Sequence, residues 1–237
     1  MSTKHLRGAT PISGNMKLAD LIDLDFRLLR ILGRLEIKLG FGEATIAQVC
    51  KRNGLDEKTF VLLCKSYTDA NFRPSAADLE NACGGDVLHY LRRSHSYYVN
   101  TALVGLQKSL EKLLECCGEP SVKVIRKFYT DYKKELERHF DYEEKVVFPY
   151  VEAICSGSKP SGSDTFLGDE HNDIDDKITD LKNIVMKYLP EDMPGSRMME
   201  TLSMLFLLRE DLQSHTAVED NILMPMIKIL EEKYGRK

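Results

Sequence analysis

Two pairs of residues in the second half of the chain have the chemistry and spacing of metal ligands. His139 is followed four positions later by Glu143, and His215 is followed four positions later by Glu219. On a helix, positions i and i+4 share one face, with Cβ atoms roughly 6 Å apart. A single helix can therefore offer an imidazole and a carboxylate to the same metal centre.

These pairs are in register with each other and with further residues. A separation of 76 positions relates His95 to His171, His139 to His215, Glu143 to Glu219 and Pro149 to Pro225. The stretches HFDYEEKVVFPYVE and HTAVEDNILMPMIK align without a gap. The sequence thus contains an internal repeat, in which each half carries one isolated His and one His-x-x-x-Glu.

Long helices must position these residues. Apolar residues at helical spacing predict helices over 76–116 (with an interruption near Gly84-Gly85), 121–154, 164–188 and 196–233. Runs of Gly, Pro and Ser between these segments predict the turns. No segment has the pattern of a strand. The predicted fold class is all-α, an up-down four-helix bundle.

In an antiparallel bundle the histidines reach similar depths. His95 lies about 22 residues before the first turn and His139 about 20 residues after it, which is roughly 33 and 30 Å along the helices. His171 and His215 are arranged similarly around the turn at 190–194. We therefore expect a site for two transition-metal ions, and the candidate ligands are His95, His139, Glu143, His171, His215 and Glu219. Imidazole with carboxylate suits iron, manganese or zinc.

Competing metal motifs are absent from the sequence. The Glu-x-x-His motif of ferritin-like proteins and the His-Glu-x-x-His motif of zinc proteases do not occur. A bundle with incidental histidines is the simpler alternative, but four histidines in register with two glutamates disfavour it. Glu144 and Asp220, which follow the two candidate ligand glutamates, are candidates for orienting the imidazoles, and the equal alternative is that both are solvated.

The region before the bundle predicts a small helical domain. We expect a flexible tail over 1–15, an N-terminal domain over 16–74 and the bundle over 75–237, with the boundary at Pro74-Ser75. Leucines at helical spacing predict a helix that runs from Leu18 to the turn at Gly40-Phe41-Gly42. A second helix should cover 44–53, and a third should start after Asp56 as N-cap.

Composition narrows the possible partners. The 37 acidic residues exceed the 33 basic ones, and the net charge of −4 disfavours nucleic-acid binding. No apolar run reaches the roughly 18 residues of a membrane span, and the N-terminus has no signal-peptide pattern, so a cytoplasmic location is expected. The six cysteines show no zinc spacing and are interpreted as reduced, mostly buried residues.

The chain resembles the hemerythrin-like family over roughly residues 80–234. The resemblance is carried by His139-Phe-Asp-Tyr-Glu143-Glu144 with Phe148-Pro149, and by His215-Thr-Ala-Val-Glu219. In the oxygen carriers of this family a further His follows the third-helix ligand by four positions, where this chain has Asp175. The set of four His and two Glu is more similar to bacterial di-iron proteins that repair iron-sulfur centres after nitrosative and oxidative damage.

That resemblance implies the cofactor and the ligands. It implies two non-haem iron ions with an oxo or hydroxo bridge, two His on each iron, and Glu143 and Glu219 as bridging carboxylates. O2 or NO would be the small ligand, and damaged iron-sulfur proteins the partners. The N-terminal region also resembles the short domain of that subfamily, but Leu39-Gly40-Phe41-Gly42 stands where the subfamily has Cys-Cys-Gly-Gly. Thiol chemistry is therefore not carried over.

Three functions remain open at this point. The first is repair of iron-sulfur centres or a response to nitric oxide and oxidative stress. The second is a di-iron gas or redox sensor, with the N-terminal domain as a docking module. The third is storage of oxygen or iron. No catalytic residue is assigned, so the sequence does not decide whether the protein is an enzyme.

Overall fold

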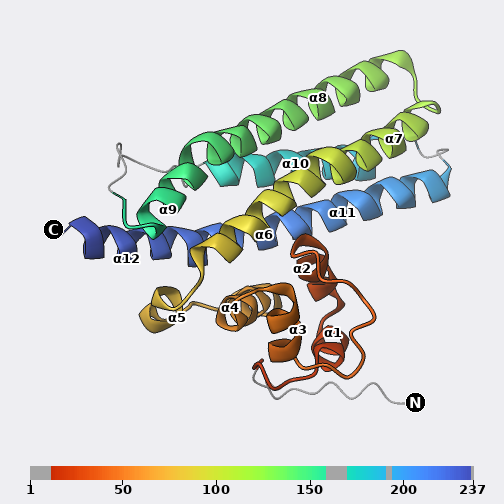
Figure 1. Cartoon of the computed structure of the whole chain (residues 1–237). Helices are drawn as coiled ribbons and strands as arrows, with labels where there is room; N and C mark the ends of the chain where they lie inside the picture. Colours follow the sequence, from red (N-terminus) through yellow and green to blue (C-terminus); the bar gives the residue numbers. More distant parts are fainter. Residues whose placement is uncertain (1–11, 159–169, 191–193, 236–237) are drawn as a thin grey trace.

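The computed structural model describes residues 12–158, 170–190 and 194–235, with the side chains of 170–173 and 234–235 excepted. The described elements are helical, apart from an isolated bridge between Lys17 and Thr45. The predicted all-α fold class is confirmed. Figure 1 shows a bundle of long helical rods with the N-terminal helices packed beneath it.

Four rods make the bundle. They are α6 (Gly84–Tyr97), η2 (Tyr98–Ala102) and α7 (Leu103–Leu114); α8 (Glu119–Tyr142), η3 (Glu143–Val147) and α9 (Phe148–Cys155); α10 (Glu170–Lys187); and α11 (Gly195–Val218), η4 (Glu219–Leu223) and α12 (Met224–Gly235). The segments η2, η3 and η4 are single π-helical turns within continuous rods. The expected interruption of the first helix is present, because α5 (Ala76–Glu80) ends before α6 begins. The predicted start of the third helix at 164 lies outside the described residues.

The N-terminal helices begin and end largely where local signals place them. They are α1 (Leu18–Leu24), η1 (Phe26–Leu28), α2 (Leu29–Arg34), α3 (Ile46–Asn53) and α4 (Glu57–Thr68). Helix α3 ends at Gly54, whose φ of 68° is left-handed as expected for a helix-terminating glycine. The side chain of Asp56 accepts a hydrogen bond from the Thr59 N–H at 2.8 Å, which confirms Asp56 as the N-cap of α4.

The prediction of one helix from Leu18 to Gly40 was wrong. Asp25 has an extended backbone and caps a new turn, since its carboxylate accepts a hydrogen bond from the Arg27 N–H at 3.0 Å. The chain leaves α2 at Glu36, whose φ is +57°, and the Ile37 N–H bonds back to the Leu32 carbonyl at 2.8 Å. This is the hydrogen bond of a Schellman motif, and it ends the helix well before the glycines.

Two apolar cores fill the molecule. One contains the N-terminal helices together with the adjoining end of the bundle, from Val87 to Leu91, Val147 to Ile154 and Val218 to Ile227. The other fills the far half of the bundle, from Tyr98 to Leu114, Ile125 to Phe140, Ile174 to Val185 and Leu205 to Leu212. Three of the rods contribute to both cores, and their apolar pattern is interrupted between the cores, whereas the buried apolar residues of α10 belong to the second core.

Two further expectations concern cysteines and membranes. Only Cys50 and Cys64 are buried; the other four thiols are exposed or partly exposed, so the prediction of mostly buried cysteines was wrong. The thiols of Cys50, Cys64, Cys83, Cys116 and Cys155 are free. None of the helices in the described ranges combines the length and apolar character needed to cross a bilayer.

Candidate metal centre

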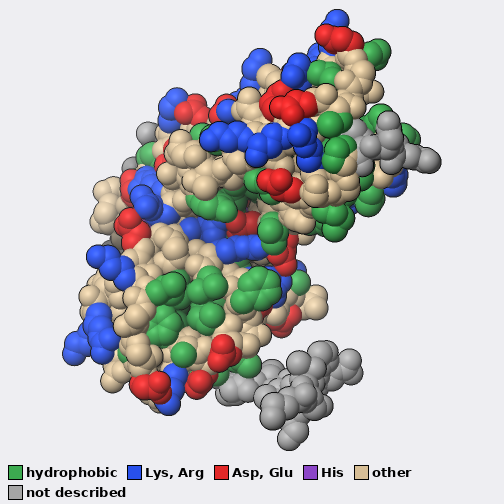
Figure 2. Space-filling view, turned by 90° about the vertical axis from the view of Figure 1, so that its right-hand side faces the viewer, with side chains coloured by type: hydrophobic (Ala, Val, Ile, Leu, Met, Phe, Trp, Pro, Cys, Tyr) green, Lys and Arg blue, Asp and Glu red, His purple; other side chains and the backbone are tan. Residues whose placement is uncertain are grey.

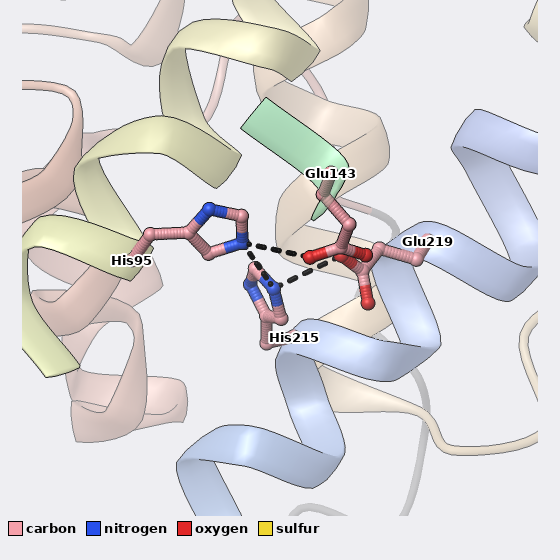
Figure 3. Close-up of side chains that lie close together, drawn as sticks. All are labelled: His95, Glu143, His215 and Glu219. Atoms are coloured by element: carbon pink, nitrogen blue, oxygen red, sulfur yellow. Dashed lines mark hydrogen bonds and ion pairs between the residues drawn. The ribbon is translucent and has the colours of Figure 1, made fainter. Parts of the chain in front are cut away.

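Four of the six candidate ligands meet in the interior of the bundle. Ligand-capable atoms of His95, Glu143, His215 and Glu219 all lie within 4.8 Å of one another. His95 comes from α6, Glu143 from η3, His215 from α11 and Glu219 from η4, and Figure 3 shows their polar ends pointing toward one another. Residues up to 124 positions apart in the sequence are thus brought to one point, as the repeat predicted.

The spacing of these atoms fits coordination of a common cation. Nε2 of His95 lies 3.2 Å from Nε2 of His215 and 3.2 Å from Oε2 of Glu143. Nε2 of His215 lies 3.0 Å from Oε1 of Glu219. Two ligand atoms at right angles on a metal with bonds of about 2.1 Å are roughly 3.0 Å apart. The donor atoms therefore already have the separations that adjacent ligands of one metal ion adopt.

The remaining two candidates are His139 and His171. His139 is buried, and its Nε2 lies 3.5 Å from Oε1 of Glu143, so it borders the cluster through that carboxylate. His171 belongs to the first turn of α10, but its side chain is outside what the structure describes. The assignment of these two residues stays a prediction.

The cluster forms a polar layer between the two apolar cores. His95, Glu143, His215 and Glu219 are between 2% and 6% exposed, so water solvates them little. Burial and the nearby Glu143 carboxylate raise the pKa of Glu219 well above its usual range. Burial and the nearby His95 ring hold the pKa of His215 well below its usual range. A cation among these atoms would offset the carboxylate charges, and imidazole with carboxylate is the donor set of iron, manganese or zinc.

His95 is oriented from its other side. Its Nδ1 lies 3.0 Å from Oε1 of Glu144, and Glu144 also accepts a hydrogen bond from Nε of Arg92 at 3.2 Å. Burial favours the neutral imidazole, but hydrogen bonds with Glu143 and Glu144 outweigh it and raise the pKa of His95. A carboxylate on Nδ1 leaves Nε2 to face the cluster. The contact of Glu144 with an imidazole is thus present, and its role in orienting a metal ligand, like that of Asp220, stays a prediction.

Aromatic rings enclose the histidines. The ring of His95 stacks on Phe140, with centroids 4.1 Å apart, and on Phe148, with centroids 5.4 Å apart. The ring of Tyr98 lies edge-on to His215 at 5.5 Å. Phe140 was not anticipated, although it directly follows the candidate ligand His139 in the sequence. These rings keep the imidazoles in one orientation and exclude water.

A π-helical turn begins at each of the two candidate ligand glutamates. The Phe148 N–H bonds to the Glu143 carbonyl and the Met224 N–H bonds to the Glu219 carbonyl, five positions back in each case. Pro149 and Pro225 follow and have no N–H for the carbonyl four positions back, which disfavours a regular α-helix there. The two π turns share the 76-residue register. Sequence reasoning noted the repeated prolines but not this consequence.

Asp175, at the position where the oxygen carriers have an additional His, is engaged elsewhere. Its carboxylate accepts hydrogen bonds from Nε and Nη2 of Arg209 at 3.0 and 2.9 Å and from Nε2 of Gln213 at 3.1 Å. The side chain therefore interacts with α11. It does not belong to the four-residue cluster.

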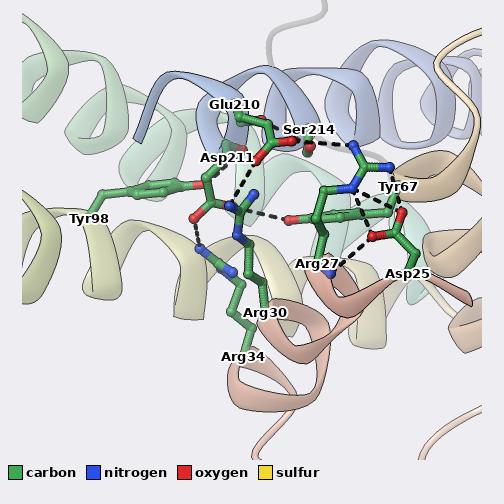
Figure 4. A network of polar contacts seen from close by, with 9 residues as sticks. All are labelled: Asp25, Arg27, Arg30, Arg34, Tyr67, Tyr98, Glu210, Asp211 and Ser214. Carbon is green, nitrogen blue, oxygen red and sulfur yellow. Dashed lines mark hydrogen bonds and ion pairs between the residues drawn. The ribbon is translucent and has the colours of Figure 1, made fainter. Parts of the chain in front are cut away.

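A buried polar network joins the N-terminal helices to the helix that carries His215 (Figure 4). Arg34 of α2 pairs through Nη2 with Oδ2 of Asp211, one helical turn before His215. The hydroxyl of Tyr98 donates to the Asp211 backbone carbonyl at 3.1 Å, and the hydroxyl of Tyr67 donates to Oδ1 of Asp211 at 3.3 Å. Sequence reasoning missed this network, because a single Arg and a single Asp 177 positions apart leave no pattern.

The fold and the buried His/Glu cluster define a helical-bundle protein with a candidate transition-metal centre. A family model described as the hemerythrin HHE cation-binding domain matches residues 86–234, and the chain belongs to this family.

The chain is also similar to curated proteins, at low sequence identity. The chain is similar to the iron-sulfur cluster repair protein YtfE of Citrobacter koseri, with 26% identity over 186 residues, which covers 78% of this chain and 83% of that protein. It is also similar to the proteins of the same name in Escherichia coli K12 and Shigella boydii, with 22% identity and the same coverage. The similarity to these repair proteins that the sequence indicated is confirmed.

Proposed function

We propose that this protein is a non-haem di-iron protein that acts in repair of iron-sulfur centres or in the response to nitrosative and oxidative stress. The proposed ligands are His95, His139, Glu143, His171, His215 and Glu219. The convergence of His95, Glu143, His215 and Glu219 within 4.8 Å is the observation that carries the proposal. The names of the curated relatives support the repair role.

The proposed roles of the acidic residues in and near the site follow from their contacts. Glu143 extends between His95 and His139, since its two oxygens lie 3.2 and 3.5 Å from their Nε2 atoms, which suits a bridging carboxylate. Glu219 is placed similarly next to His215. A di-iron centre supplies redox chemistry and open coordination positions for O2 or NO. Asp175 bonds to Arg209, so one imidazole fewer than in the oxygen carriers is offered from α10.

A second candidate function is gas or redox sensing. The buried contact between Arg34 and Asp211 joins the N-terminal helices to α11 one turn before His215. A displacement of α11 at His215 would therefore be transmitted to the N-terminal helices through the Arg34–Asp211 ion pair. In this reading the N-terminal helices dock a partner protein in a metal-dependent way.

Metal analysis tests the metal centre. Protein expressed with ample iron and purified without oxygen should contain about two irons per chain and give a Mössbauer spectrum of non-haem iron. His215→Ala and Glu143→Ala should lose most of this iron. His89→Ala, which removes a partly buried histidine of the same helix as His95, is the matched control and should keep it. Wild-type protein without metal would contradict the proposal.

Functional assays then separate repair from sensing. In the repair reading, the iron-loaded protein restores the activity of an enzyme whose iron-sulfur cluster was damaged by NO, and the His215→Ala variant does not. In the sensing reading, cluster recovery is absent and partner binding depends on O2 or NO. Titration with NO and O2, followed by ultraviolet and visible absorption, shows which gas the site takes.

A further inference from the structure

A cavity separate from the metal centre lies between the N-terminal helices and the bundle. It has a volume of about 460 Å³ and is bounded by α2 on one side and by α6 and η2 on the other. The residues that line it are Leu29, Arg30, Gly33, Arg34, Arg93, Ser96, Tyr97, Asn100 and Thr101. Figure 2 shows blue Lys and Arg side chains gathered at the waist between the two parts of the molecule. The volume is within the range of small-ligand sites.

The lining of this cavity has one sign of charge. Three arginines line it, and none of the described lining residues is an Asp or a Glu. The acids that pair with these arginines lie outside the lining: Glu210 bonds Arg30, Asp211 bonds Arg34 and Glu36 bonds Arg93. Each of these pairings uses a single guanidinium nitrogen, Nη2, whereas a guanidinium carries five N–H donors.

Two of the arginines have donors that the protein leaves unsatisfied. Within the described residues, Nη1 of Arg30 and Nε of Arg34 are buried and have no hydrogen-bond partner. The Arg34 side chain is only 5% exposed, so water does not compensate it. Buried donors without acceptors are costly, and those on a cation more so. Figure 4 shows both side chains rising from α2 toward α11.

The rest of the lining suits the body of a small organic molecule. The hydroxyls of Ser96 and Thr101 and the amide of Asn100 offer neutral hydrogen bonds, while Leu29 and Tyr97 offer apolar surface. Gly33 leaves the wall open, since a Cβ at this position would meet no atom within 4 Å. Arginine recognises carboxylates and phosphates through paired N–H donors, which is the anion chemistry this lining fits.

We propose that this cavity binds a small organic anion through a phosphate or carboxylate group held by Arg30, Arg34 and Arg93. Arg34 contacts α11 through Asp211, and Ser96 and Tyr97 directly follow His95 on α6. The anion would therefore contact Ser96 and Tyr97, which directly follow the proposed ligand His95, and Arg34, whose partner Asp211 lies one helical turn before the proposed ligand His215. The cavity does not depend on the metal assignment, because none of its lining residues is a proposed ligand.

Calorimetric titration of the full chain at low ionic strength tests this proposal, with inorganic phosphate and succinate as probes. We expect one equivalent of at least one probe to bind with a dissociation constant of about 1 mM or tighter. Arg93→Gln should weaken binding about tenfold or more, because it removes a charged donor. Gly33→Leu should abolish binding by filling the cavity. The fold should tolerate this substitution, because Gly33 is an exposed helical residue and leucine favours helix more than glycine does.

Arg126→Gln is the matched control, since this exposed arginine of α8 also forms an ion pair, with Glu111, but lies outside the cavity. It should bind the probe as wild type does, and thermal melting should show that all variants fold. Binding of phosphate alone indicates a phosphate ester as the natural ligand, and binding of succinate alone indicates a carboxylate. Failure of wild-type protein to bind either probe, or equal affinity in wild type and Gly33→Leu, would overturn the proposal. Neither result depends on iron content.

Discussion

Nη2 of Arg34 lies 2.5 Å from Oδ2 of Asp211, and both side chains are only 5% exposed. This buried ion pair crosses from the N-terminal helices to the helix that carries His215. The guanidinium also lies over the rings of Tyr97 and Tyr98, at 4.9 and 5.4 Å from their centroids. Arg34 therefore fixes α2 to α6 and α11 together.

Replacing Arg34 by Met should destabilise the protein by about 3–5 kcal/mol, because the Asp211 carboxylate would remain buried without its partner. The free energy of unfolding in urea is the measurement. Arg126→Met is the control, since it breaks an exposed ion pair with Glu111 and should change stability little. Equal effects of the two substitutions would show that the Arg34 pair is solvated in solution.

Glu144→Gln should weaken metal binding by about 10- to 100-fold without unfolding the bundle, because Glu144 orients His95 through Nδ1. Competition with a chelator of known affinity measures this. Glu152→Gln is a close control: Glu152 also accepts a hydrogen bond from Arg92, at 2.6 Å, but in the described part of the chain it forms no hydrogen bond with His95. If both variants bind metal as tightly as wild type, the contact between Glu144 and His95 is not functional.

Pro149→Ala should reduce metal binding while leaving helix content equal or higher. An alanine N–H at this position can bond to the carbonyl four positions back, so a regular α-helix competes with the π turn that begins at Glu143. Circular dichroism and metal analysis of the same sample test this. Pro120→Ala, near the start of α8 where proline suits a helix, should leave both quantities unchanged.

Stability should fall steeply at high pH. Burial raises the pKa of Tyr90 to about 12, and it raises those of Tyr67 and Tyr98 well above the usual range. A folded state with a raised pKa keeps its proton where the unfolded chain, with tyrosine pKa values near 10, loses it. Unfolding is therefore favoured as pH rises from about 10 toward 12.

The phenolate absorbance of the folded protein measures this. It should appear in two stages, with the buried tyrosines ionising only as the protein unfolds. Tyr188→Phe removes an exposed phenol and should diminish the first stage only, whereas Tyr90→Phe should diminish the second. A single titration step that coincides with that of free tyrosine would show that the phenols are accessible in the native state.

The bundle was predictable from the sequence because its helices follow local rules. Apolar periodicity and the Gly-Glu-Pro and Pro-Gly breaks act within a few residues, and the same holds for the Asp56 cap in the N-terminal helices. The largest error in the predicted helices was at Asp25. Its side-chain cap separates two helical segments within a stretch whose leucines keep helical spacing. Leucine periodicity continues through that break, so it conceals the capping signal.

The convergence of His95, Glu143, His215 and Glu219 was predictable because the repeat keeps these residues in register. What surrounds them was not. The contact between Arg34 and Asp211 and the stacking of His95 on Phe140 depend on how rods from distant parts of the chain pack. Neither leaves a periodic trace. The π turns were partly predictable. The prolines at repeated positions are visible in the sequence, but they indicate a π turn only once the missing proline N–H of the α-helical hydrogen bond is considered.

The core shared by the N-terminal helices and the near end of the bundle has a practical consequence for any attempt to shorten the chain. Leu63, Val87, Phe148 and Ile222 belong to the same buried cluster, so a truncation at Ser75 would bare the apolar ends of three rods. Exposed surface of that kind promotes self-association. The N-terminal helices thus cover the apolar end of the bundle, and a shortened protein would need solubilising substitutions there before its metal binding could be compared with that of the whole chain.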